Sequence, residues 1–347
     1  MIRECLVKLS QKQTLQENET YKCMMEILGG EATQAQIGSY LAFLTAKGET
    51  ADEIIGSVKA MREKMTPLNA EGLNAIDVCG TGGDHKGTFN ISTTASLVLA
   101  GGGVVVAKHG NRAASSQCGS AEVLEALGVK IDPPIRTIEN CLKEAKIAFL
   151  FAPHFHPAMK NVGPLRKEIG FRTMFNILGP MCNPASVKRQ VIGVFNLENA
   201  EKIAEVLRRS GTEKVITLHS EDGLDEVSCA AKTILLEQYP EQKPGQKSIN
   251  RHLIAPEDFG FQQFSLDEIL GSDAKSNAKI VMEVLEGKKG PRRDAVVMNA
   301  AIGFYLASDR TQLEKSYLKE FRSKAEESID SGKALQALKT LEKVSHQ

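Results

Sequence analysis

Apolar and polar positions follow a helical period over the first seventy or so residues. The recurring apolar positions in one stretch are Ile37, Tyr40, Leu41 and Leu44. Thr33 and Thr50 are each followed three residues later by Gln or Glu, which is the pattern of a capping box. Gly48 stands where the helix between them would end. This part of the chain therefore predicts several short helices.

From Asn74 the pattern changes, because short β-branched or apolar runs begin to alternate with helical stretches. The predicted strands are 75–78, 104–107, 147–151, 191–195 and 215–218. Helical stretches such as 121–127 and 200–207 lie between them. This alternation favours an α/β fold with a mainly parallel central sheet flanked by helices. Continuous apolar strands are typical of a sheet that is covered on both faces.

Residues 161–184 interrupt this alternation with two Gly-Pro steps and several charged side chains. We predict that the segment is helical and packs near the N-terminal helices. The predicted organisation is a small helical domain of residues 1–72, joined by roughly 161–184, and a larger α/β domain of residues 73–160 and 185–347. The last third is expected to be mostly helical, with an irregular charged stretch around 242–256.

Composition narrows the class of protein and the partners that it can have. Basic and acidic residues balance at 43 each, so no net field attracts nucleic acid or an anionic membrane, and neither is expected as a partner. The seven cysteines form no Cys-x-x-Cys pair, which favours reduced thiols and a cytoplasmic location. The N-terminal residues do not resemble a signal peptide, and no apolar run is long enough to span a membrane.

The most informative stretch follows the first predicted strand, where Gly80, Gly82 and Gly83 stand within four residues. Glycines let a ligand approach the backbone, and free N–H groups before a helix form a concave anion site. The stretch has neither a Walker motif nor the dinucleotide-binding glycine spacing, which argues against an ATPase and a nicotinamide enzyme. We interpret it as a phosphate or pyrophosphate site; tight packing alone is the alternative.

Two further loops carry donors that suit an anion. Asn90, Ser92 and Thr93 stand at the start of the next helix, where they can bind phosphate, reach a divalent cation or simply cap the helix. The run 108–112, Lys-His-Gly-Asn-Arg, follows the second predicted strand, and a donor-rich loop continues it with Ser115, Ser116, Gly119 and Ser120. A solvated basic loop would explain the charges alone, whereas the clustered serines and glycines favour anion binding.

Acidic residues and histidines supply the remaining candidate chemistry. Asp225 and Glu226 lie in a loop after the fifth predicted strand, where adjacent carboxylates can bind Mg²⁺ shared with substrate phosphates. An acidic surface turn is the alternative for this pair. His154 and His156 have no cysteine or carboxylate close in sequence, so a pocket wall or a structural role is favoured over a transition-metal site.

These segments, in this order, resemble the anthranilate phosphoribosyltransferase family over nearly the whole chain. The matching pieces are the runs 80–84, 90–93, 108–112, 156–160, 172–180 and 225–226. The resemblance implies a nucleoside phosphorylase/phosphoribosyltransferase-like fold and a homodimer. It implies a glycosyltransferase of tryptophan biosynthesis, in which the amine of anthranilate displaces pyrophosphate from 5-phosphoribosyl 1-pyrophosphate. Whether a glutamine amidotransferase associates with the chain is left open.

The resemblance also implies roles for individual residues. The expected donor-binding residues are Gly80, Thr81, Gly82, Gly83, Asp84, Thr88, Asn90, Ser92, Thr93, Lys108 and Ser120. The anthranilate path is expected to involve Gly80, His109, Asn111, His154 and Arg166. Ser92, Asp225 and Glu226 are expected to serve two Mg²⁺ ions. Arg166 can supply a planar cation for the anthranilate carboxylate, and closure of the two domains would bring the substrates together.

Two other functions stay open on the sequence alone. A pyrimidine nucleoside phosphorylase has a related architecture, although it needs no acidic metal pair. A nucleic-acid-binding relative without activity would need a basic stripe, which the balanced charge does not favour. The chain departs from the family pattern at 117–118 and 229–232, outside the residues named above.

Overall fold

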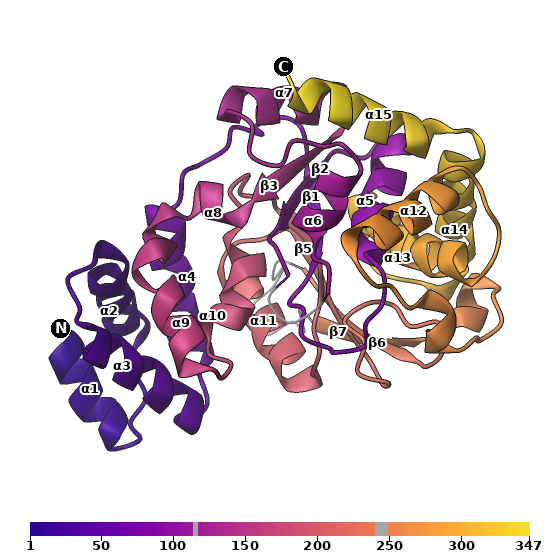
Figure 1. The fold of residues 1–347 in the computed structure, drawn as a ribbon. Coiled ribbons are helices and arrows are strands. Elements are labelled where there is room, and N and C mark those ends of the chain that lie inside the picture. The colour runs from indigo at the N-terminus through magenta and orange to yellow at the C-terminus, as the bar shows by residue number, and fades with distance from the viewer. Residues whose placement is uncertain (114–116, 240–248) are drawn as a thin grey trace.

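The computed structural model describes residues 1–113, 117–239 and 249–347, so Ser115, Ser116 and the first part of the 242–256 stretch lie outside the described residues. Four helices come first and form the left-hand part of Figure 1: α1 (Ile2–Ser10), α2 (Glu17–Gly29), α3 (Gln34–Lys47) and α4 (Ala51–Lys64). Both predicted capping boxes are present, with Thr33 and Thr50 each accepting a backbone N–H at 3.3 Å. Gly48 ends α3 with a positive φ of 86°, as predicted.

A seven-stranded sheet forms the centre of the molecule, in the order β3-β2-β1-β4-β5-β6-β7. The first five strands are parallel: β1 (Ile76–Gly80), β2 (Val106–Gly110), β3 (Ile147–Phe151), β4 (Arg189–Gly193) and β5 (Lys214–Ser220). All five were predicted from the apolar runs, although the ends of four of them shift. The strand order reverses direction at β1, which has β2 on one side and β4 on the other.

The last third is mostly helical, as expected, but two antiparallel strands at the edge of the sheet were not predicted. They are β6 (Thr233–Gln238), which pairs with β5, and β7 (Ile249–Ile254), which pairs with β6. β7 lies within the stretch 242–256, which was predicted to be irregular. Its sequence mixes Asn250, Arg251 and His252 with apolar residues, so it lacks the apolar pattern of a strand. Pairing with a neighbour, rather than intrinsic preference, decides whether such a segment becomes a strand.

Helices connect the strands and cover both faces of the sheet (Figure 1). The first six are α5 (Ile91–Gly101), α6 (Ser120–Ala126), α7 (Ile135–Glu144), α8 (Ala152–Phe155), α9 (Gly163–Ile169) and α10 (Phe175–Leu178). The others are α11 (Leu197–Arg209), α12 (Ala274–Leu285), α13 (Pro291–Ala307), α14 (Lys315–Asp330) and α15 (Lys333–Ser345). Short 3₁₀ turns are η1 (Pro157–Asn161), η2 (Gly179–Cys182), η3 (Pro256–Phe259) and η4 (Leu266–Ile269).

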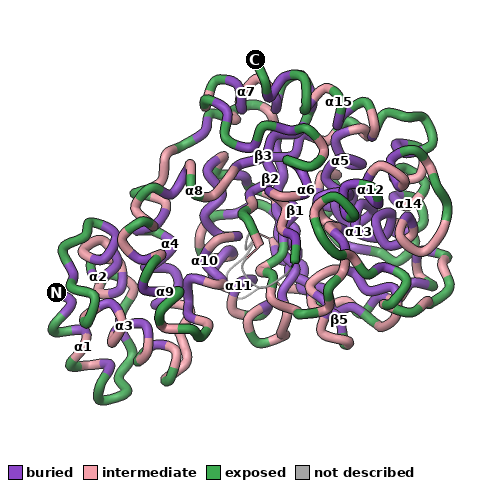
Figure 2. Tube along the Cα trace, viewed as in Figure 1, coloured by how far each residue is buried: buried purple, intermediate pink, exposed green. Residues whose placement is uncertain are grey.

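The two faces of the sheet belong to two apolar cores, and Figure 2 shows the strands buried between their covering helices. On β5, Ile216 and Leu218 join the core under α5 and α13, whereas Val215 joins the core under α11. This division follows from the alternation of side chains along a strand. The second core is continuous with the helices α1–α4 and with the segment 161–184.

The segment 161–184 is helical, as predicted, and lies against the N-terminal helices. Asn161 Nδ2 donates to the carbonyl of Leu28 at 2.9 Å, and Arg62 Nε donates to the carbonyl of Met181 at 2.9 Å. Within the described residues no helix is both long and apolar enough to cross a membrane, and the described cysteines form no disulfide with one another.

Candidate active site

The candidate site lies at the carboxyl ends of the parallel strands, beside the reversal of strand order at β1. Ligands of α/β sheets bind at such a switch point, because loops from neighbouring strands diverge there. The glycine turn (residues 80–84) begins at the end of β1, the basic run (residues 108–112) overlaps the end of β2, and the acidic turn, which contains Asp225 and Glu226, follows β5. The structure therefore brings the three predicted ligand-binding loops to one edge of the sheet.

The glycine turn adopts a backbone conformation that favours glycine. Gly82 and Gly83 have φ values of 66° and 81°, in the left-handed region that most side chains avoid. The N–H of Thr81 donates to the carbonyl of Gly193 at 2.8 Å, which ties the start of the turn to β4. Asp84 accepts from the N–H of Lys86 at 3.2 Å, and Thr88 forms an isolated bridge with Leu270.

Asp225 packs across the ends of β1 and β4, where Gly80 and Gly193 occupy the last paired position. A Cβ on Gly80 would lie 2.5 Å from Asp225 Oδ2, and a Cβ on Gly193 would collide with the Asp225 carbonyl. Asp225 Oδ2 also accepts the N–H of Gly82 at 2.8 Å. Because Gly80 and Gly193 lack side chains at paired positions, the acidic turn can pack against the glycine turn.

Glu226 connects the acidic turn to the start of α5. Its Oε1 accepts the N–H of Ser92 at 3.1 Å, so a carboxylate occupies the N-terminal end of that helix, where the helix dipole favours negative charge. The hydroxyl of Ser92 lies 3.4 Å from the Lys108 ammonium, which is a potential donor to it. Ser92, Asp225 and Glu226, the three residues expected to serve the metal, thus lie in one connected network with the glycine turn.

The electrostatics of the acidic pair suit a divalent cation. Desolvation raises the pKa of Asp225 to about 7, with the neighbouring Asp84 adding to the effect. Desolvation likewise raises the pKa of Glu226 to about 8, with Asp225 adding and Lys108 opposing. Carboxylates crowded in this way repel one another until a cation lies between them. The described residues contain no cluster of three or more His, Cys, Asp or Glu that could hold a metal.

Lys108 is buried at the centre of this network rather than exposed in a basic loop. The structure extends β2 to Gly110, so Lys108 and His109 lie in the strand, which corrects the predicted loop. The Lys108 ammonium donates to the carbonyl of Val78 at 2.8 Å, and its side chain is 2% exposed. Burial lowers the pKa of Lys108, while Asp77, Cys79 and Glu226 act in the opposite direction. Lys108 thus supplies positive charge from beneath the loops.

Asn90 links two loops and a distant helix. Its Nδ2 donates to the carbonyl of Cys118 at 3.2 Å, and its Oδ1 accepts from Asn277 Nδ2 at 3.0 Å. Asn277 lies on α12 and is 2% exposed, so the contact is inside the protein. Ser120 begins α6 and donates to the carbonyl of Asn111 at 3.2 Å, whereas Thr93 is buried within α5. The role of Asn277 could not be read from the sequence, because no motif surrounds it.

A histidine pair lies beside the strand ends on the side of the helical segment. His109 and His156 have ring centroids 5.2 Å apart, and both residues are buried. His109 Nδ1 lies 3.1 Å from the carbonyl of Gly179, so this nitrogen carries the proton. His109 Nε2 and both ring nitrogens of His156 are buried without a hydrogen-bond partner among the described residues. Of the two roles that the sequence favoured over a transition-metal site, these unpaired nitrogens fit a polar pocket wall better than a satisfied structural histidine.

Burial keeps these two histidines neutral. It lowers the pKa of His109 to about 3, with His156 adding to the effect. It lowers the pKa of His156 to about 4, with the Cys182 backbone acting in the opposite direction. The remaining path residues are more accessible: Asn111 is exposed, and His154 is half-buried, with its ring 5.2 Å from that of Phe155. Arg166 lies 5.4 Å from the centroid of the Phe175 ring.

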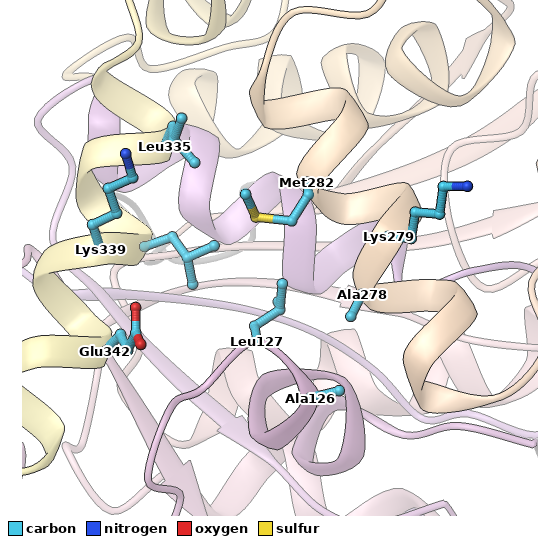
Figure 3. Close-up of a pocket in the computed structure, with 9 residues that line it drawn as sticks. Ala126, Leu127, Ala278, Lys279, Met282, Leu335, Lys339 and Glu342 are labelled. Carbon is cyan, nitrogen blue, oxygen red and sulfur yellow. The ribbon is translucent and has the colours of Figure 1, made fainter.

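A separate groove of about 320 Å³ lies between α6, α12 and α15, lined in part by Leu127, Met282 and Leu335 (Figure 3). None of the residues expected to bind substrate or metal lines it. It is therefore distinct from the candidate site at the strand ends.

Comparison with known proteins gives one consistent family. The sequence model described as "Glycosyl transferase family, a/b domain" matches residues 72–335, and "Glycosyl transferase family, helical bundle domain" matches residues 3–65. Anthranilate phosphoribosyltransferase from Salinibacter ruber is 46% identical over 333 residues, which cover 95% of this chain and 94% of the relative. The enzyme of that name from a Thermoanaerobacter species is 45% identical, with 97% of each chain covered.

Solved structures agree with these relatives. The anthranilate phosphoribosyltransferase of Thermus thermophilus has a TM-score of 0.89 at 38% identity, with 99% of each chain covered. The Saccharomyces cerevisiae enzyme in complex with PRPP and Mg has a TM-score of 0.88 at 27% identity and covers 99% of this chain and 98% of its own. With this similarity over nearly its whole length, the chain belongs to the anthranilate phosphoribosyltransferase family.

Proposed function

We propose that the chain transfers the 5-phosphoribosyl group of 5-phosphoribosyl 1-pyrophosphate to the amine of anthranilate, a step of tryptophan biosynthesis. The observation that carries this proposal is the network in which the glycine turn, the start of α5 and buried Lys108 meet the pair Asp225–Glu226. Solved relatives support it, since the Saccharomyces cerevisiae anthranilate phosphoribosyltransferase has been solved in complex with PRPP and Mg and, separately, with 4-fluoroanthranilate.

The glycine turn and the adjoining loops would bind the phosphorylated donor. The proposed contacts are Gly80, Thr81, Gly82, Gly83, Asp84, Thr88, Asn90, Ser92, Thr93 and Ser120, with Lys108 supplying charge from beneath. The C1–O bond to pyrophosphate breaks and a C1–N bond to anthranilate forms, so negative charge accumulates on the leaving group. Backbone N–H groups and fixed cations aimed at that charge lower the barrier.

Asp225, Glu226 and Ser92 would hold Mg²⁺, and we propose two ions for this site. Their oxygen donors fit a hard cation, and the raised pKa values of the two carboxylates indicate charge that a cation would compensate. When bound, Mg²⁺ neutralises the phosphate oxygens of the donor and of the departing pyrophosphate. The residues themselves orient the turn, because Asp225 fixes Gly82 and Glu226 fixes Ser92.

The anthranilate path would run along Gly80, His109, Asn111, His154 and Arg166, and we add His156 to this set. His109 Nε2 is neutral, buried and unpartnered among the described residues, so it can accept a hydrogen bond from the substrate amine. An aromatic amine is already nucleophilic near neutral pH, and its proton can leave to solvent after C–N bond formation. The Arg166 guanidinium, placed against Phe175, would pair with the anthranilate carboxylate.

We further propose a homodimer and a cytoplasmic location. Val7 on α1 is 60% exposed and Phe43 on α3 is 36% exposed, so the outer helices present apolar side chains that a second copy could cover. We also propose that residues 1–72 together with 161–184 act as one unit that closes on the strand ends, with residues 73–160 and 185–347 forming the donor-binding unit.

An assay of anthranilate fluorescence tests the activity. We expect the signal to fall only when 5-phosphoribosyl 1-pyrophosphate and Mg²⁺ are both present, with phosphoribosylanthranilate identified by mass. Unchanged fluorescence in the complete mixture, with the protein folded, would contradict the proposal. Product analysis with uridine and inorganic phosphate checks the phosphorylase alternative.

A further inference from the structure

Arg172 connects the helical segment to the glycine turn, a contact that the expected site residues did not include. It stands between α9 and α10, so its backbone belongs to the segment that packs on the N-terminal helices. Its Nη2 donates to the carbonyl of Gly83 at 2.6 Å. The same nitrogen lies 3.4 Å from His85 Nε2.

The guanidinium is fixed on a second side by an aromatic ring. Its central carbon lies 4.2 Å from the centroid of the Phe195 ring, just beyond the end of β4. A planar guanidinium can stack on a ring and donate in its own plane at the same time, which an ammonium cannot do. The contact therefore depends on the shape of arginine as well as on its charge.

Gly83 is shaped for this contact. Its φ of 81° already disfavours a side chain, and a Cβ at this position would collide with the Arg172 guanidinium. The preceding residue, Gly82, donates its N–H to Asp225 at 2.8 Å. The turn is thus held at two consecutive residues, by a carboxylate of the acidic turn and by a cation of the helical segment.

We infer that Arg172 is a positioning residue that fixes the glycine turn for the phosphorylated donor and links its geometry to the placement of the helical segment. The inference rests on the proposed function, because it assigns the turn to the donor. The two arginines of this segment thus have different proposed roles. Arg166 would bind the anthranilate carboxylate, whereas Arg172 acts on the donor side through Gly83.

The test compares Arg172→Ala, Arg172→Lys and Phe195→Leu in the full chain. We expect Arg172→Ala to raise the KM for 5-phosphoribosyl 1-pyrophosphate roughly ten-fold, the change expected from loss of a charge-assisted hydrogen bond, with the KM for anthranilate little changed. Arg172→Lys should restore little of the loss, and Phe195→Leu should show the same donor-specific defect. A donor KM restored by lysine, or equal rises in both KM values, would overturn the inference.

Arg209→Ala is the matched control. Arg209 Nη1 pairs with Asp52 at 2.7 Å and so joins α11 to α4 without touching the glycine turn. We expect it to leave the donor KM unchanged; a rise equal to that of Arg172→Ala would show a general effect of weakened packing and overturn the inference. Calorimetric binding of the donor with Mg²⁺, without anthranilate, separates this result from the proposed function. A parent protein that binds the donor but forms no phosphoribosylanthranilate refutes only the activity, while unchanged donor affinity in Arg172→Ala refutes the positioning role.

Discussion

Asp225 occupies the space that a side chain on Gly80 would fill, with Oδ2 at 2.5 Å from the position of a Cβ there. The acidic turn reaches the strand ends only because this residue, and its partner across the β1–β4 pairing, lack side chains. The carboxylate then holds the glycine turn through Gly82. One steric relationship thereby sets the distance between the two loops on which the proposed chemistry depends.

Gly80→Ala should therefore impair catalysis far more than stability. The added methyl group displaces the Asp225 carboxylate, and a shift of about 1 Å in a catalytic loop can lower kcat/KM roughly a hundred-fold. Steady-state kinetics and a thermal melt measure the two effects. Gly38→Ala on α3 is the control, because a Cβ there meets nothing within 4 Å. Wild-type kinetics in Gly80→Ala would show that the close approach is unimportant.

Mg²⁺ should stabilise the protein through the acidic pair. Binding to the folded state alone adds about 2.7 kcal/mol when the free ion is at about a hundred times its Kd. We expect Mg²⁺ to raise Tm in the parent protein and to have no such effect in the variant with Asp225→Asn and Glu226→Gln, which should also lose turnover at low Mg²⁺. Asp309→Asn, at a fully exposed side chain paired with Arg189, should keep the shift. A Mg²⁺ response that survives the double substitution would place the ion elsewhere.

The buried histidines should make the protein sensitive to acid. The folded-state pKa values of His109 and His156, about 3 and about 4, lie below the ordinary value of 6.5. Between these values the unfolded chain binds more protons at these two positions, so the stability that the buried histidines contribute is complete above about pH 6.5 and is lost as the pH drops towards 4. Denaturant unfolding at about pH 7, 5.5 and 4.5 should show a shallower loss in His109→Gln with His156→Gln. His346→Gln, which alters an exposed histidine, should follow the parent, and an unchanged slope in the double variant would count against this cause.

Arg166→Ala should weaken anthranilate use selectively. Loss of a charge-assisted pair with the substrate carboxylate should raise the anthranilate KM roughly ten-fold or more, while the donor KM stays close to that of the parent. Lys167→Ala removes an adjacent exposed charge and should change neither constant. A normal anthranilate KM in Arg166→Ala would remove the role assigned to this residue.

Local sequence patterns were sufficient for much of the fold. The capping boxes at Thr33 and Thr50 and the strand 147–151 depend on neighbours in the chain, and the structure confirms them. The family resemblance and the fold class were likewise predictable, because several short motifs occur in a fixed order. The placement of Asp225 beside Gly82 followed from a general property of parallel sheets, whose carboxyl ends lie at one edge.

The features that the sequence did not reveal depend on partners far along the chain. β7 became a strand because β6 pairs with it, not because its residues favour that conformation. His156 gained its significance from the proximity of His109, and Asn277 from its bond to Asn90 across 187 positions. The Arg172–Gly83 contact spans 89 positions and joins two motifs that were each recognised separately. No local pattern encodes such pairings.

The apolar core that the first helices share with the segment 161–184 has a consequence for chimeras and truncations. Ile27 and Ile55 from the beginning of the chain belong to the same cluster as Met174 and Phe175. If only the first 72 residues were exchanged between relatives, their apolar side chains would pack against a segment 161–184 from a different protein. The two sets of side chains would not be matched in shape unless that segment were exchanged as well. Chimeras designed for new specificity should therefore exchange residues 1–72 and 161–184 together.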